Sequence, residues 1–157
     1  MLNRLREQLL GYIDQPHTHG SLMDAVKGLP EKYINEKPEG LPYSFWGMLE
    51  HIRLSQFDMI DFMQNPAYKE LEWPKDYWPD ESEKATRKMW DEAISMFQKD
   101  TETLKKIIND PEVDLFAKIP HGSGQTIFRE VMQIIDHNSY HIGQLIVMRR
   151  MIGEWKG

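Results

Sequence analysis

The stretch HGSGQTIFREVMQIIDHNSYHIGQLIVMRR, residues 121–150, predicts a long, largely buried helix. Its apolar residues recur at helical spacing from Ile127 to Met148, a pattern typical of a helix with one face in a protein core. The same inward face carries His137 and His141, because residues four apart lie within about 40° of each other on a helix. A buried helix that presents two imidazoles on one side needs a chemical reason for them.

The remainder of the chain predicts further helices around this one. A short helix begins after Ser21, and proline and glycine interrupt the chain between the longer helical patterns. No segment shows a convincing strand pattern. We therefore predict a single all-α domain over residues 1–157, folded as an antiparallel four-helix bundle. Its long helices are expected from Leu2 to Asp14, from Ser44 to Met63, from Asp80 or Ser82 to Asn109, and from Ser123 or Gly124 to Ile152.

Composition narrows the classes of function. The 157 residues are 40% hydrophobic and carry a net charge of -6, which argues against a nucleic-acid partner because phosphate binding needs clustered basic side chains. There is no cysteine, so a metal site has to use His, Asp or Glu. Charges interrupt the apolar residues at the N-terminus, and no apolar stretch is long enough to span a bilayer. We expect a soluble cytoplasmic protein without a membrane partner.

A third histidine lies on the second long helix, in the stretch MLEHIRLSQ, residues 48–56. His51 is surrounded there by apolar residues, and the small side chain of Ser55 on a similar face leaves room for a pocket. A histidine on one helix and an i, i+4 pair on another can form a three-histidine metal site inside a bundle. Three protein nitrogens leave a coordination position open for substrate, as in catalytic sites. From the pattern alone, hydrogen-bonded core histidines remain an equal alternative.

Other polar residues are candidates for supporting roles. Asp58 lies about two turns from His51 and could orient a ligand histidine, and Gln144 could reach the edge of the site. His121 lies in the glycine-containing segment just before the last helix, which could bind an anion but which we interpret as a helix start. His17 and His19 are interpreted as solvated loop residues.

Two segments together resemble a known family. The stretch from Leu41 to Pro79, followed later by residues 121–150 with the motif H-x-x-x-H-x-G-Q, closely resembles the DinB-like (damage-inducible, YfiT-like) family of metal-binding four-helix bundles. The resemblance extends from PHTHGSLMDAV to MRRMIG. It implies a divalent metal, usually zinc or nickel, held by His51, His137 and His141, and a homodimer. Related members include transferases and isomerases that use low-molecular-weight thiols, and others described as metal-dependent hydrolases.

The motif also limits the chemistry. The sequence is HNSYH, so Asn138 occupies the place where a zinc protease has its glutamate base. The nucleophile would then be metal-bound water or an external thiol. The sequence leaves two functions open. The protein is either a metal-dependent enzyme that acts on a small molecule, by hydrolysis or thiol transfer, or a non-catalytic metal- or ligand-binding stress-response protein.

Overall fold

The computed structural model describes residues 2–14 and 19–155 of the chain. These residues form an all-α structure, and the one strand-like pairing among them is an isolated bridge between Lys118 and Thr126. None of the described helices combines the length and the apolar character needed to cross a lipid bilayer. The elements in chain order are α1 (Leu2–Asp14), α2 (Leu22–Val26), the 3-10 turn η1 (Glu31–Tyr33), α3 (Phe45–Gln64), the 3-10 turn η2 (Lys75–Tyr77), α4 (Arg87–Asn109) and α5 (Ile127–Met151).

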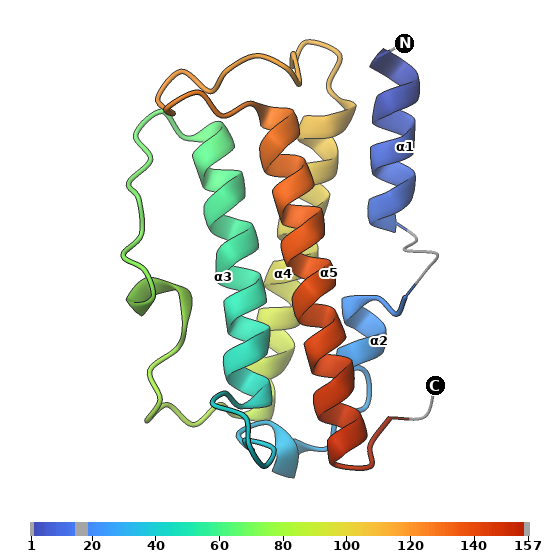
Figure 1. Cartoon of the computed structure of the whole chain (residues 1–157), viewed down its shortest axis with the longest axis vertical. Coiled ribbons are helices and arrows are strands. Elements are labelled where there is room, and N and C mark those ends of the chain that lie inside the picture. The colour runs from blue at the N-terminus through green and yellow to red at the C-terminus, as the bar shows by residue number, and fades with distance from the viewer. Residues whose placement is uncertain (1, 15–18, 156–157) are drawn as a thin grey trace.

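Three long helices, α3, α4 and α5, run alongside one another, as Figure 1 shows. Helix α3 packs against both α4 and α5, α1 packs against α4, and α2 packs against α5. The long connection between α3 and α4 crosses the outside of α3 and includes η2. Residues of this connection therefore lie beside the same helix that carries His51.

The helix starts follow from side-chain caps. Ser21 and Asp24 form the reciprocal pair of a capping box, and the Ser44 hydroxyl accepts a hydrogen bond from the Gly47 amide. Both caps satisfy amides that have no partner inside the helix. The predicted starts of α2 and α3 are confirmed at these two serines.

Two predicted helix starts were wrong. Helix α4 begins only after Thr86, because Asp80 accepts hydrogen bonds from the amide and hydroxyl of Ser82 and so forms a local turn that competes with the helix. Helix α5 begins after Thr126. Before it, Gly124 adopts a φ of 123°, which is incompatible with a helix.

The buried apolar side chains form two clusters at opposite ends of the long helices. One cluster centres on Phe45, Trp90 and Leu145, and the other on Leu104, Ile108 and Val131. The parts of α3 and α5 between them carry polar side chains instead. We call this set the polar layer; it comprises His51, Ser55 and Gln56 on α3 and His137, Asn138 and His141 on α5. Because burying polar groups is costly unless they are paired, the polar layer marks the place to look for a site.

Candidate metal centre

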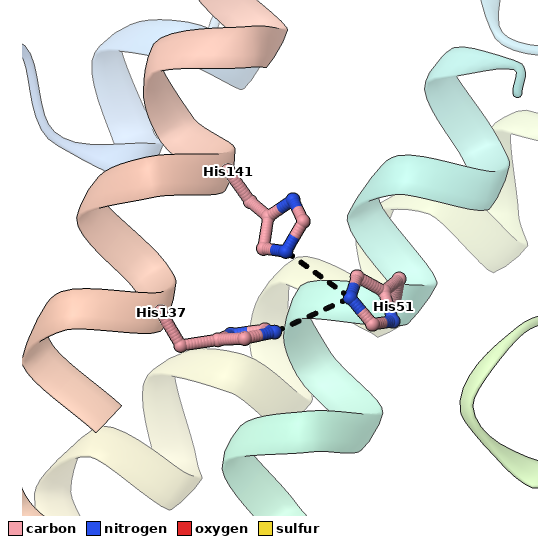
Figure 2. Close-up of side chains that lie close together, drawn as sticks. All are labelled: His51, His137 and His141. Atoms are coloured by element: carbon pink, nitrogen blue, oxygen red, sulfur yellow. Dashed lines mark hydrogen bonds between the residues drawn. The ribbon is translucent and has the colours of Figure 1, made fainter. Parts of the chain in front are cut away.

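The three histidines of the polar layer converge on one point. His51 extends from α3, and His137 and His141 extend from successive turns of α5, as Figure 2 shows. The Nε2 atom of His51 lies 3.2 Å from Nε2 of His137 and 3.2 Å from Nε2 of His141. All three possible ligand atoms lie within 4.8 Å of one another. The structure thus brings together the three residues that the sequence suggested as ligands.

The opposite ring nitrogens fix the protonation of two of these imidazoles. The Nδ1 of His51 lies 3.0 Å from the backbone oxygen of Tyr77, and the Nδ1 of His141 lies 2.6 Å from Oε1 of Gln144. A carbonyl oxygen only accepts hydrogen bonds, so each Nδ1 carries the proton and donates it. The Nε2 atoms of His51 and His141 therefore direct lone pairs toward the common point, as metal-binding imidazoles do.

The pKa values of the three imidazoles are lowered by their surroundings. The pKa of His51 is lowered to about 4, chiefly by burial; the Tyr77 carbonyl opposes this shift and the neighbouring His141 adds to it. Burial also lowers the pKa of His137 to about 4, with His141 and His51 contributing. The pKa of His141 is lowered by burial and raised again in part by Gln144. At neutral pH the cluster is uncharged and its nitrogens are available as ligands.

The donor set fits a divalent transition metal. Two nitrogens that bind one ion at about 2.0–2.1 Å are roughly 3.3 Å apart at a tetrahedral angle and about 2.9 Å apart at a right angle. The two separations that involve Nε2 of His51, 3.2 Å each, fall within this interval. Imidazole is a ligand that suits zinc, copper, iron and nickel. A cation would also be attracted by the Nε2 lone pairs of His51 and His141, which face each other at 3.2 Å.

The connection between α3 and α4 forms one wall of the cluster. The Trp78 ring stacks on the His51 ring with a centroid separation of 4.0 Å and an interplanar angle of 3°. Trp73 approaches His51 edge-on at 6.2 Å and is 67% exposed. On the α5 side, the largely exposed Tyr140 lies edge-on to His141 at 4.8 Å. Aromatic rings thus flank the imidazoles, two of them open to solvent.

Asp58 supports the cluster through the connection rather than by direct contact with a histidine. Its carboxylate accepts hydrogen bonds from the hydroxyls of Tyr77 at 2.7 Å and Tyr68 at 2.9 Å. Burial and the bond to Asp58 raise the pKa of both tyrosines well above the usual range. Asp58 therefore holds in place the residue whose carbonyl orients His51. The sequence suggested that Asp58 could orient a ligand histidine, and the structure connects it to His51 only through Tyr77, because tyrosine hydroxyls bind both of its carboxylate oxygens.

The remaining candidates separate into near and distant residues. Gln144 contacts His141, and Ser55 is buried one turn after His51. His121 lies elsewhere: its Nε2 donates to the backbone oxygen of Phe62 at 2.7 Å, about 16 Å along α3 from His51. It is therefore not a pocket residue of this cluster. The exposed His19 bonds to the carbonyl of the next residue, and His17 lies outside the described residues.

Two functional neighbours could not be recognised from the sequence. The carbonyl of Tyr77 is a backbone group, and its position depends on the path of the irregular connection. The pair of Asn138 and Gln56 joins α5 to α3 through a hydrogen bond of 2.8 Å from Nδ2 of Asn138 to Oε1 of Gln56. This pair lines a cavity of about 340 Å³ that is otherwise formed mainly by residues of α1, α2, α4 and α5, and the three histidines do not line it.

One of the comparisons with known proteins identifies a family. A family model described as the DinB superfamily matches residues 17–145. The chain belongs to the DinB superfamily. The matched region includes all three histidines of the cluster, and membership of the DinB superfamily together with this cluster is compatible with metal binding. The search of curated proteins found no match, and neither did the search of solved structures.

The stability of the metal-free protein is expected to fall as the pH is lowered from about 6.5 to about 4. In the unfolded chain a histidine takes up a proton near pH 6.5, whereas folded His51 and His137 do so only near pH 4. Between these values the unfolded state binds more protons, so acidification favours unfolding. Urea unfolding across this range checks the slope. The double variant His51→Gln, His137→Gln should lose this part of it, and an unchanged slope would contradict the assignment.

Proposed function

We propose that this DinB-superfamily protein holds one divalent metal ion, zinc or nickel, on Nε2 of His51, His137 and His141, and uses it in thiol-dependent transfer on a small molecule. The observation that carries the proposal is the convergence of three uncharged imidazoles without a carboxylate in the cluster. Three protein ligands leave a coordination position open, as in catalytic sites. We also infer that α1, α3, α4 and α5 form an antiparallel four-helix bundle around it, which the packing of α3 on α4 and α5 supports.

The missing carboxylate favours a thiol over water as the nucleophile. The acidic residues of α3 near the cluster are already engaged: Asp58 binds two tyrosines and Glu50 binds Arg53. No general base in the described cluster is available to remove a proton, so ionisation would depend on the ion. A bound divalent ion acidifies its ligands, and a thiol needs far less acidification than water to ionise at neutral pH. Soft thiolates also suit zinc and nickel.

The protein's own residues would then position and shield the reactants. The Tyr77 carbonyl and Gln144 hold two imidazoles in orientation, and Trp78 covers one face of the His51 ring. Trp73 and Tyr140 lie beside the cluster and are exposed enough to contact a substrate. In the transfer, a bond forms between the thiolate sulfur and an electrophilic carbon, the bond from that carbon to its leaving group breaks, and the thiol proton passes to solvent.

The test of this proposal is an assay of the zinc- or nickel-loaded protein with a chromogenic aryl halide and a panel of low-molecular-weight thiols, such as cysteine and glutathione. We expect halide release that requires both a thiol and the metal and that is lost in His137→Ala. Hydrolysis of an aryl ester without any thiol would instead support a metal-dependent hydrolase. If the loaded protein turns over neither substrate class, the non-catalytic stress-response alternative gains.

The homodimer implied by the family resemblance is also a proposal. Tyr140, Val147 and Met151 lie on one exposed face of α5 and offer an apolar surface for a second copy. The molar mass from light scattering would decide between a monomer of 18.6 kDa and a dimer.

A further inference from the structure

Two buried polar atoms beside the candidate metal centre lack hydrogen-bond partners. They are Nδ1 of His137 and Oδ1 of Asn138, and they are the two such side-chain atoms found in residues 2–14 and 19–155. A buried polar atom without a partner costs about 1–3 kcal/mol. One of the two atoms belongs to a candidate ligand and the other to the next residue of α5. Because both lack a partner at the same place, a single cause would account for both.

The orientation of the Asn138 amide is fixed by a chain of hydrogen bonds that starts on α4. The buried Gln56 donates from Nε2 to the backbone oxygen of Phe97 at 3.0 Å and to the Thr101 hydroxyl at 3.2 Å. Because the Phe97 oxygen only accepts, the Gln56 amide nitrogen has to face α4 and its oxygen has to face Asn138. That oxygen in turn accepts from Nδ2 of Asn138. The Asn138 oxygen is thereby turned away from Gln56 and left free as an acceptor.

Metal binding would determine where the proton of His137 resides. In the metal-free protein a proton on Nε2 of His137 can be donated to the lone pair on Nε2 of His51, 3.2 Å away. If Nε2 instead binds an ion, the single proton of the neutral ring has to reside on Nδ1. The Nδ1 of His137 is buried, so its proton then requires an acceptor. The corresponding protons of His51 and His141 already have theirs.

We propose that Asn138, held in orientation by Gln56, is a positioning residue that accepts the Nδ1 proton of His137 when the metal is bound. Asn138 directly follows His137 on α5, and its free oxygen and the Nδ1 of His137 are both buried without a partner. A hydrogen bond between them would satisfy both atoms at once. The inference rests on the proposed metal site and extends it to a chain of groups that runs from α4 through α3 to α5.

The hydrogen bond from Asn138 to Gln56 also explains why this sequence has asparagine, and not the glutamate of H-E-x-x-H, after the first histidine. The side chain after His137 is an amide that both donates and accepts, and a glutamate there could not donate to Gln56. Asn138 thus links the ligand to the scaffold, whereas a glutamate after the first histidine serves zinc proteases as a base.

The test measures zinc affinity by competition with a chromophoric chelator, and the stability of the metal-free protein, for the wild type and three variants. For Asn138→Leu we expect zinc affinity to fall by about 10–100-fold, the usual effect of losing the partner of a ligand histidine. Asn138→Asp keeps an acceptor oxygen but sets its other oxygen against Oε1 of Gln56. It should therefore lose stability while it retains zinc affinity. Ser139→Ala is the matched control, because this hydroxyl bonds only to the carbonyl of Ile135, and neither quantity should change.

A spectroscopic measurement separates positioning from general support of the fold. In nitrogen-15 NMR spectra of the zinc-loaded wild type, we expect His137 to carry its proton on Nδ1, and we expect this proton to exchange with solvent faster in Asn138→Leu. Equal zinc affinity of Asn138→Leu and wild type would overturn this inference and leave the metal site intact. Failure of the wild type to bind zinc or nickel would overturn the metal site and the inference together.

Discussion

Replacing His51 with alanine is expected to remove high-affinity zinc binding. His51 is the one member of the cluster contributed by α3, and its Nε2 lies within 3.2 Å of both other ligand atoms. Loss of a partner that merely orients a ligand weakens metal binding by about 10–100-fold, so loss of a ligand itself should weaken it by more than about 100-fold. Competition with a chelator of known affinity measures the change directly.

His121→Ala is the matched control for this variant. His121 is an exposed histidine whose Nε2 bonds to the carbonyl of Phe62 near the far end of the same helix. Its removal should leave zinc affinity unchanged, although it removes the same functional group. If His51→Ala binds zinc as tightly as His121→Ala does, the ion is held elsewhere and the three-histidine assignment fails.

Replacing Asp58 with alanine is expected to weaken both stability and zinc binding. Its carboxylate fixes the connection between α3 and α4 through the hydroxyls of Tyr68 and Tyr77. Hydrogen bonds to a charged group contribute about 1.5–3 kcal/mol each, so the free energy of unfolding should fall by about 3 kcal/mol. Because the Tyr77 carbonyl would no longer be held against His51, zinc affinity should fall by about 10-fold.

Asp61→Ala provides the comparison for Asp58→Ala. Asp61 lies on the same helix, and its carboxylate accepts one long hydrogen bond of 3.3 Å from the Asn65 side chain. Its removal should have a small effect on urea unfolding and none on zinc affinity. Full zinc affinity in Asp58→Ala would show that the tyrosine contacts stabilise the fold without positioning His51.

The convergence of the histidines was predictable because helix geometry is regular. A spacing of four residues places His137 and His141 on one face of α5, and the apolar surroundings of His51 indicate that it points inward. Ser21 and Ser44 were equally recognisable as caps because a serine before an apolar run has a local role that does not depend on the tertiary fold. Their assignment as metal ligands and the bound metal stay predictions.

The partners of the histidines were less accessible because they depend on irregular or long-range structure. Tyr77 orients His51 with a backbone carbonyl, which has no signature in the sequence. Asp58 was expected on a helix face similar to that of His51. The tyrosines that donate hydrogen bonds to its carboxylate, however, come from a connection with no regular periodicity, so they could not be predicted. The role of Asn138 depends on Phe97, 41 residues away in the chain and joined to it through Gln56. Contacts of this kind become visible only when the helices are packed.

The arrangement of the core gives the polar layer its significance. Apolar clusters fill both ends of the long helices, and the polar layer lies between them. An apolar layer would stabilise the fold more simply, because buried polar groups have to be fully paired to avoid a penalty. The two atoms that remain unpaired, on His137 and Asn138, both lie at the proposed metal centre. An ion that fixes the tautomer of His137 would allow this pair to be satisfied.

The most direct test of the account is the metal content of the untagged wild-type protein, purified without a chelator and then titrated with zinc and nickel. The account predicts about one divalent ion per chain, held by His51, His137 and His141, with saturation at that stoichiometry and an increase in thermal stability on binding. A protein that contains no metal as purified and binds neither zinc nor nickel when it is offered would contradict the account. The three imidazoles would then be a buried polar cluster of the core.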